Sequence, residues 1–121
     1  MAGEFQRGAV RMHILHHASI GQVHGAWMTA ELAHHGHAIS PGTLYPTLHR
    51  MQAEGLLVSH MVVVEGRKRR VYQATDAGRE ALEADRTALR ELVREVLPGA
   101  GGTDLGSGGP GERRVPAVST E

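Results

Sequence analysis

The sequence predicts a mainly α protein with one small β-hairpin, and three observations support this fold class. Residues 4–18, 25–35 and 40–55 carry apolar side chains at helical spacing. A Val-rich stretch over residues 56–75 has extended character, and residues 76–97 repeat apolar positions every seven residues. With only four aromatic residues in 121, Leu, Val, Ala and Met must fill a small core, so burial against a second copy is expected.

The first helix is expected over residues 4–18 because no proline interrupts them and their apolar residues recur at helical spacing. One apolar stripe begins at Phe5 and a second at Val10, which predicts burial on two sides. We expect residues 19–24 to form a loop through Gly21.

The next two predicted helices are joined by a very short turn. The second covers Gly25 to His35, and Gly36 offers the left-handed residue that often ends a helix. Ser40 then offers a capping oxygen, and Pro41 suits the first helical position. The third helix shows a single apolar stripe of Leu44, Leu48 and Met51. Two helices connected in this way form a helix-turn-helix.

A β-hairpin is predicted after the third helix, with strands over residues 56–64 and 71–75. Between them lie Glu65, Gly66 and four consecutive cations, which we place at the hairpin tip: Arg67, Lys68, Arg69 and Arg70. A hairpin beside a helix-turn-helix is typical of a winged helix-turn-helix.

Thr75 can cap a fourth helix that runs to about Leu97, where Pro98 and Gly99 stop it. Its apolar residues form a seam suited to a partner helix, although Asp85 limits the length of any coiled coil. We therefore expect a homodimer paired through Leu82, Leu89, Leu92, Val93 and Val96.

Three segments follow from these elements. Residues 1–75 are expected to form a winged helix-turn-helix DNA-binding domain, and residues 76–97 a C-terminal dimerisation helix. Residues 98–121 hold many Gly and Pro and too few apolar residues to offset the entropy of ordering, so we expect a disordered tail.

Composition excludes several classes of function. The formal net charge is zero, which argues against a generally basic protein that coats nucleic acid. The absence of cysteine excludes disulfides and thiolate sites, and no apolar run or leader suggests a membrane span or export, so a cytoplasmic location is expected. No nucleophile elbow, phosphate-binding loop or H-E-x-x-H motif points to an enzyme.

The stretch SPGTLYPTLHRMQAEGLL, Ser40 to Leu57, with YQATDAGREAL, Tyr72 to Leu82, resembles the PadR family of bacterial transcription regulators. The resemblance covers roughly residues 5–97, and the single C-terminal helix is similar to the short subgroup of that family. It implies a homodimer, usually a repressor, that grips an inverted-repeat operator. The family often shows His-Gly-Tyr-Glu at the second helix, where this chain has Ala26 and Trp27 after His24 and Gly25. Trp27 and Met28 are candidates to line an apolar effector pocket or, alternatively, plain core.

On the third helix, Thr43, Pro46, His49 and Arg50 fall away from the apolar stripe and would face the major groove. Arg50 can donate to a guanine, Thr43 can touch a thymine methyl group or a phosphate, and Tyr45 can reach a phosphate. The predicted DNA-binding set is Ser40, Pro41, Gly42, Thr43, Tyr45, Pro46, His49, Arg50, Arg67, Lys68, Arg69 and Arg70. A solvated arginine and a solvated charged loop are the alternatives for Arg50 and the basic run.

Pro46 removes one backbone hydrogen bond from the third helix. Either the helix starts later, at Thr43, or a slightly bent helix lays its N-terminal amides near the DNA backbone.

Nine histidines are unusual in 121 residues. His13 and His17 are four apart, a spacing that lets two imidazoles hold one zinc-like ion. A third ligand would come from His16, Glu4 or another chain, and exposed or interface histidines are the alternative. The expected function is a sequence-specific regulator, a repressor released by a small effector. The alternatives are a metal-responsive regulator and a winged-helix module that binds protein.

Overall fold

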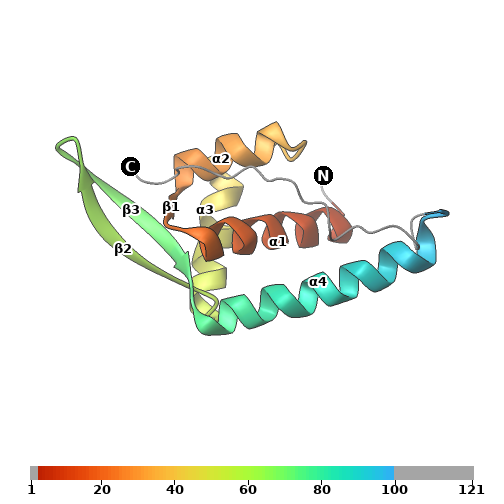
Figure 1. The fold of residues 1–121 in the computed structure, drawn as a ribbon. Coiled ribbons are helices and arrows are strands. Elements are labelled where there is room, and N and C mark those ends of the chain that lie inside the picture. The colour runs from red at the N-terminus through yellow and green to blue at the C-terminus, as the bar shows by residue number, and fades with distance from the viewer. Residues whose placement is uncertain (1–2, 100–121) are drawn as a thin grey trace.

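The computed structural model describes residues 3–99 as four helices and a three-stranded antiparallel sheet, which confirms the predicted mainly α class (Figure 1). In chain order the elements are α1 (Glu4–Ile20), β1 (Val23–His24), α2 (Gly25–His34), α3 (Pro41–Ala53), β2 (Leu57–Val64), β3 (Arg67–Ala74) and α4 (Asp76–Val96). The tail predicted to be disordered lies, from residue 100 onward, outside the described residues. Among the helices described, none has the length and apolar character needed to cross a membrane.

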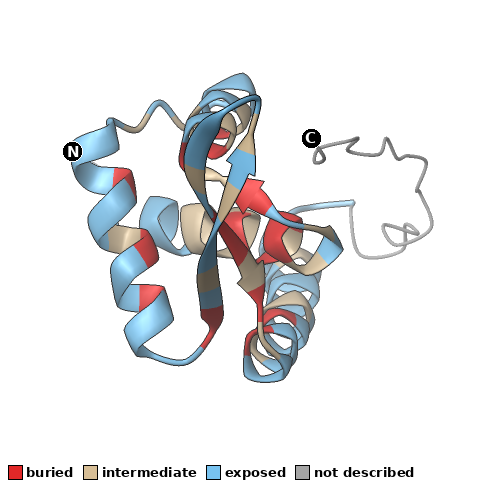
Figure 2. Ribbon diagram, turned by 90° about the vertical axis from the view of Figure 1, so that its left-hand side faces the viewer, coloured by how far each residue is buried: buried red, intermediate tan, exposed pale blue. Residues whose placement is uncertain are grey.

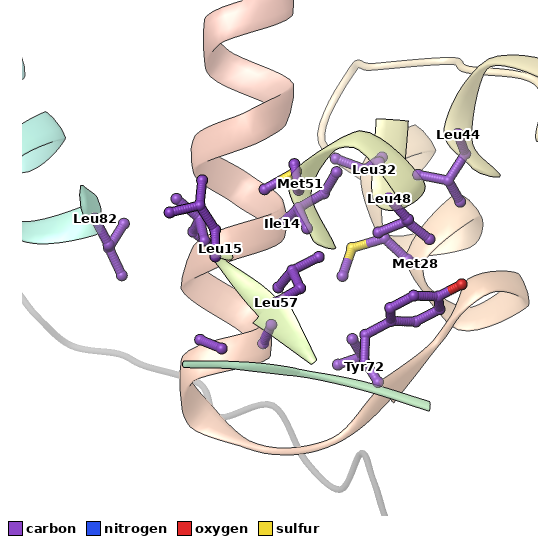
Figure 3. Packing of buried hydrophobic residues seen from close by; sticks show 14 residues of the cluster. Ile14, Leu15, Met28, Leu32, Leu44, Leu48, Met51, Leu57, Tyr72 and Leu82 are labelled. Carbon is purple, nitrogen blue, oxygen red and sulfur yellow. The ribbon is translucent and has the colours of Figure 1, made fainter. Parts of the chain in front are cut away.

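The core forms where α1 meets the other helices and the inner end of the sheet (Figure 3). Ile14 and Leu15 of α1 are fully buried there. The predicted stripe on the third helix is confirmed, because Leu44, Leu48 and Met51 are at most 1% exposed. Leu and Met supply most of the large buried side chains, as the scarcity of aromatic residues requires. This packing fixes which face of α3 points outward.

The sheet has the order β1-β3-β2, and its first strand lies where a loop was predicted. Val23 pairs with Tyr72 and His24 with Val71, so residues 19–24 are not simply a loop. Val23 is buried, which explains why this short segment joins the sheet. A strand of two residues is too short to show alternation in the sequence.

The hairpin turn consists of Glu65 and Gly66, whose φ angles are 52° and 78°. Two left-handed residues form the tight turn that matches the twist of antiparallel strands. Strand β3 therefore begins at Arg67, and its first residue pairs with Val64. The basic run lies along a strand rather than at the hairpin tip, so that part of the prediction was wrong. Arg and Lys have little strand propensity of their own, and pairing with the Val-rich β2 imposes the conformation.

Helix α4 starts as predicted, since the Thr75 hydroxyl accepts a hydrogen bond from the Gly78 amide at 3.0 Å. A Cβ at Gly78 would collide with the carbonyl oxygen of Leu56, so glycine is what allows α4 to approach the start of β2. Leu82 is only 3% exposed and lies in the chain's own core. It therefore cannot belong to a seam available to a partner, which corrects that part of the prediction.

Beyond Leu82, α4 runs alongside α1 (Figure 1), and most of its residues there are exposed, as the pale blue of Figure 2 indicates. Leu89, Leu92 and Val96 are 41%, 45% and 58% exposed. Phe5 near the start of α1 is also exposed. The predicted seam is thus reduced to Leu89, Leu92, Val93 and Val96. Within the single chain, the helix beside α4 is α1.

Candidate nucleic-acid interface

Helix α3 presents all of its predicted DNA-contacting residues to solvent. Its apolar stripe is buried, so the opposite face must point outward. The exposed set on and before this helix is Ser40, Pro41, Gly42, Thr43, Tyr45, Pro46, His49 and Arg50. An α-helix fits into the major groove of DNA, and these side chains offer hydrogen-bond donors and a positive charge to the groove.

The N-terminus of α3 differs in one detail from the prediction. Pro41 occupies the first helical position as expected, and the helix does not start later at Thr43. Ser40 precedes it, but its side chain makes no capping bond to a backbone amide. The Ser40 hydroxyl instead lies 3.4 Å from the Thr43 hydroxyl. Both hydroxyls are exposed, so they can serve as donors to an anion at the helix N-terminus.

Pro46 lies inside α3 and cannot donate to the Gly42 carbonyl. At the next residue, the Thr47 hydroxyl donates to the Thr43 carbonyl at 2.9 Å. A threonine bond of this kind, to the carbonyl four residues back, often accompanies a slight bend in a helix. The proline therefore lies on the outer face without ending the helix.

Tyr45 lies against the start of α2, a contact that the sequence pattern did not reveal. A Cβ at Gly25 would overlap the Tyr45 ring, so the first residue of α2 must lack a side chain for the ring to lie there. Tyr45 remains 40% exposed beside this contact. A glycine at the start of a predicted helix was the available signal, because glycine is costly there unless another group approaches closely.

A groove of about 870 Å³ lies between the start of α1, residues 36–40 and α3. Arg50 and Thr43 line it from α3, and Arg7 and Arg11 line it from α1. Arg11 also pairs with Glu54, with 2.9 Å between Nη1 and Oε1. The groove therefore brings three arginines beside the exposed face of α3, although the charge of Arg11 is offset by Glu54.

The basic run divides between the two faces of the hairpin because side chains alternate along a strand. Lys68 and Arg70 share the face of Tyr72, while Arg67 and Arg69 share the face of Val71. Opposite Lys68 and Arg70 stand Val63 and Met61, both well exposed. The four cations therefore do not form one cluster.

The face that carries Arg70 is linked to α3 by hydrogen bonds. Arg70 Nη1 donates to the Ser59 hydroxyl at 3.1 Å, and that hydroxyl donates to Gln52 Oε1 at 2.9 Å. Gln52 lies near the end of α3. The chain of contacts orients the inner half of the hairpin relative to α3. Lys68 and Arg70 consequently lie on the hairpin face nearest that helix.

The predicted histidine pair lies away from this surface, between α1 and α2. The rings of His13 and His17 stack with centroids 6.2 Å apart. His16, one of the predicted third ligands, turns instead toward α4, where Arg86 Nη2 lies 3.2 Å from His16 Nδ1. The described contacts instead bring to the pair Glu31 of α2 and two histidines that follow this helix, His35 and His37.

Burial lowers the pKa of all three α1 histidines. For His17, loss of water and then the neighbouring His16 lower the pKa to about 4, against the opposing influence of Glu31. The pKa of His13 is lowered by burial and by His37, and that of His16 by burial and by Arg86. These imidazoles are consequently neutral near pH 7.

Trp27 and Met28, the candidates for an effector pocket, belong to the core region. Met28 is fully buried and Trp27 packs partly buried against the core cluster. The Trp27 ring also meets the edge of His17 at 5.1 Å between centroids. Both residues therefore contribute to packing in this structure.

Comparison with known proteins identifies the fold and the family. The family model described as the transcriptional regulator PadR-like family matches residues 14–84, which is more than half of the chain. The chain belongs to the PadR-like family of transcriptional regulators. It is 69% identical over 96 residues to the transcriptional regulator Rv3488 of Mycobacterium tuberculosis, covering 79% of this chain and 90% of that protein.

Solved structures of PadR-like regulators agree with this assignment. A PadR-like transcriptional regulator from Bacillus cereus has a TM-score of 0.70 at 31% identity, covering 80% of this chain and 99% of that one. A PadR family regulator from Eggerthella lenta has a TM-score of 0.64 at 31% identity, covering 79% and 88%. This PadR-like chain is therefore a DNA-binding transcription regulator rather than an enzyme.

Proposed function

We propose that the protein is a homodimeric repressor that binds an inverted-repeat operator and is released by a small effector. The observation that carries this proposal is the exposed face of α3 beside the cationic hairpin, in a chain of a transcription-regulator family. The contacting residues are the twelve predicted from the sequence, with Lys68 and Arg70 closest to α3. Residues 3–75 supply the DNA-binding surface, and α4 supplies most of the pairing surface.

Pairing through α4 is supported by surface that one chain leaves uncovered. Leu89, Leu92 and Val96 lie on the part of α4 beyond the core. Exposed apolar residues repeated on one helix are typical of a surface that binds another protein. A second copy with the same surface would cover both sets through a two-fold axis. The same axis would set two α3 helices about 34 Å apart, one turn of DNA.

Arg50 is the proposed reader of a base edge. It is exposed and makes no ion pair within residues 3–99, whereas Arg11 in the same groove is paired with Glu54. Its guanidinium can donate two hydrogen bonds to guanine O6 and N7. Hydroxyls of Ser40 and Thr43 and the lysine and arginines of β3 would contact phosphates, which orient the protein without selecting a sequence.

Two other functions can be weighed against particular features of the structure. A metal-responsive regulator, in which the effector is a divalent ion, is favoured by the histidines gathered between α1 and α2. A winged-helix module that binds protein is disfavoured by the cations that remain exposed on β3 and at Arg50. DNA binding by a dimer is therefore the primary proposal.

The test is DNA binding by the wild-type chain and by Arg50→Ala. A gel-shift assay with promoter fragments, including the region upstream of its own gene, should first identify a retained operator. Arg50→Ala should weaken operator binding by about 1 to 3 kcal/mol and random DNA by less. Arg94→Ala is the matched control, since Arg94 pairs with Glu91 near the end of α4. Equal losses on operator and random DNA would show that Arg50 does not read a base.

A further inference from the structure

The histidines between α1 and α2 form one cluster around a carboxylate. Glu31 Oε2 lies 2.9 Å from His35 Nε2 and 3.5 Å from His17 Nε2. The His13 ring lies 5.3 Å from that of His35 and 5.1 Å from that of His37, between centroids. Four imidazoles and a carboxylate from two helices and the loop after α2 therefore occupy one region.

The hydrogen bonds of the cluster are incomplete. His17 is only 6% exposed, and its Nδ1 has no hydrogen-bond partner among the described residues. His37 Nδ1 is likewise buried without a partner in that part of the chain. Buried polar atoms without partners cost free energy and are uncommon in native proteins. Together with the crowded rings, these atoms show that the described protein groups do not satisfy all the nitrogens of the cluster, as is expected of side chains that bind a ligand.

The cluster also has the donor atoms of a metal site. An imidazole nitrogen binds a metal ion in its unprotonated form. The carboxylate of Glu31 supplies the negative charge that two neutral imidazoles lack, and an imidazole and carboxylate donor set suits zinc and similar divalent ions.

We propose that His17, Glu31 and His35 bind one divalent transition-metal ion of the zinc class, with His13 or His37 completing the site. This extends the predicted His13 and His17 pair by Glu31 of α2, which the sequence alone did not indicate, and by His35, one of the histidines at the end of that helix. It deepens the metal-responsive function proposed above. Its test requires no DNA, so failure of the site and failure of the DNA-binding proposal are distinguishable.

The metal-free side chains need a small rearrangement to bind the ion. Among residues 3–99, no group of three or more histidine or acidic side chains is already arranged as a metal site. Glu31 Oε2 now stands between two imidazole nitrogens, at the distances given above. His35 is exposed and can rotate toward the same side as His17. An ion between these atoms would replace the present hydrogen bond of His35 with Glu31.

A metal ion in this place would join α1 to the end of α2. The His17 side chain comes from α1, whereas Glu31 and His35 lie at the last turn of α2 and just beyond it. Residues 36–40 then lead directly into α3. Binding would therefore fix the connection between α1, which packs against α4, and α3, which carries the DNA-contacting face.

Calorimetric titration of the metal-free full chain with zinc chloride tests the site. One saturable ion per chain is expected, and Glu31→Gln and His35→Gln should each weaken its affinity at least about tenfold. Both positions are accessible to solvent, so these variants should fold, which far-UV circular dichroism verifies. His60→Gln is the control, because His60 is exposed on β2 and contacts Gln22 outside the cluster.

Thermal unfolding supplies a second readout. Zinc should raise the melting temperature of the wild-type chain and of His60→Gln, because an ion that binds only the folded state stabilises it. At the same zinc concentration it should raise that of Glu31→Gln by less, because the weaker site contributes less binding free energy. Several weak ions per chain with affinities unchanged by Glu31→Gln and His35→Gln would overturn the proposal, as would the absence of saturable binding.

Discussion

At the residue scale, two glycines decide how closely elements approach each other. Gly78 allows the first turn of α4 to lie against the Leu56 carbonyl, and Gly25 leaves room for the Tyr45 ring. The two contacts differ in kind, because a hydrogen-bonded backbone carbonyl cannot move aside, whereas a half-exposed tyrosine can. Neither contact can be read from helical periodicity, which records only which side chains are apolar.

Replacing Gly78 by alanine should destabilise the fold. The added methyl group would collide with the Leu56 carbonyl, which also accepts a hydrogen bond from the Thr75 amide at 3.0 Å. Overpacking of this kind costs about 1 to 3 kcal/mol in the free energy of unfolding. Chemical denaturation followed by circular dichroism measures the change.

Gly8→Ala is the matched control for this prediction. Gly8 also lies within a helix, but a Cβ there would meet no atom within 4 Å. Alanine is the better helix former, so this change should stabilise the chain by up to about 1 kcal/mol. If both substitutions change stability in the same direction, the close contact at Gly78 does not control the position of α4.

At the scale of elements, the sequence was sufficient to predict four helices and the hairpin but not the exact position of the basic run. Leu44, Leu48 and Met51 have a spacing that defines the buried face of α3 directly. The strand residues Arg67 to Arg70 have no such pattern, and their conformation follows from pairing with Val64 to Met61. Likewise, Glu31 and His35 could not be joined to His17 before the packing of α1 on α2 was known. Local patterns predict elements, whereas contacts between elements determine the sites.

The alternation of cations along β3 gives a prediction about the wing. Lys68→Ala with Arg70→Ala should weaken binding to all DNA, because these residues lie on the hairpin face nearest α3. The slope of log affinity against log salt should fall by up to about 2 per monomer, at about 0.9 for each phosphate that the variant no longer neutralises.

Arg67→Ala with Arg69→Ala removes the same charge from the opposite face of the hairpin. Its effect on the salt slope should be smaller, and fluorescence anisotropy at several salt concentrations compares the two variants. Equal slopes for both pairs would mean that the hairpin presents both faces to DNA, contrary to the orientation inferred from the contact of Arg70 with Ser59.

At the scale of the whole molecule, the proposed function depends on two copies acting together. One chain presents a single α3 and a hairpin, and it leaves Leu89, Leu92 and Val96 of α4 largely exposed. Burial of a leucine contributes roughly 1.5 to 3 kcal/mol when it is complete. Pairing along α4 would therefore stabilise a small core and also place two α3 helices on one operator.

Operator binding and mass by light scattering, measured together on Leu89→Asp, test this central claim most directly. Val63→Asp is the control for mass and heat stability only, because Val63 is a 69% exposed apolar residue on the hairpin, away from α4 but opposite Lys68. We predict a dimeric wild-type chain, and a Leu89→Asp variant that is monomeric, less heat-stable and unable to bind the operator, because an unpaired charge would stand in the seam. The Val63→Asp control should stay dimeric. A monomeric wild-type chain at micromolar concentration, or a dimeric Leu89→Asp variant with intact operator affinity, would contradict pairing through α4.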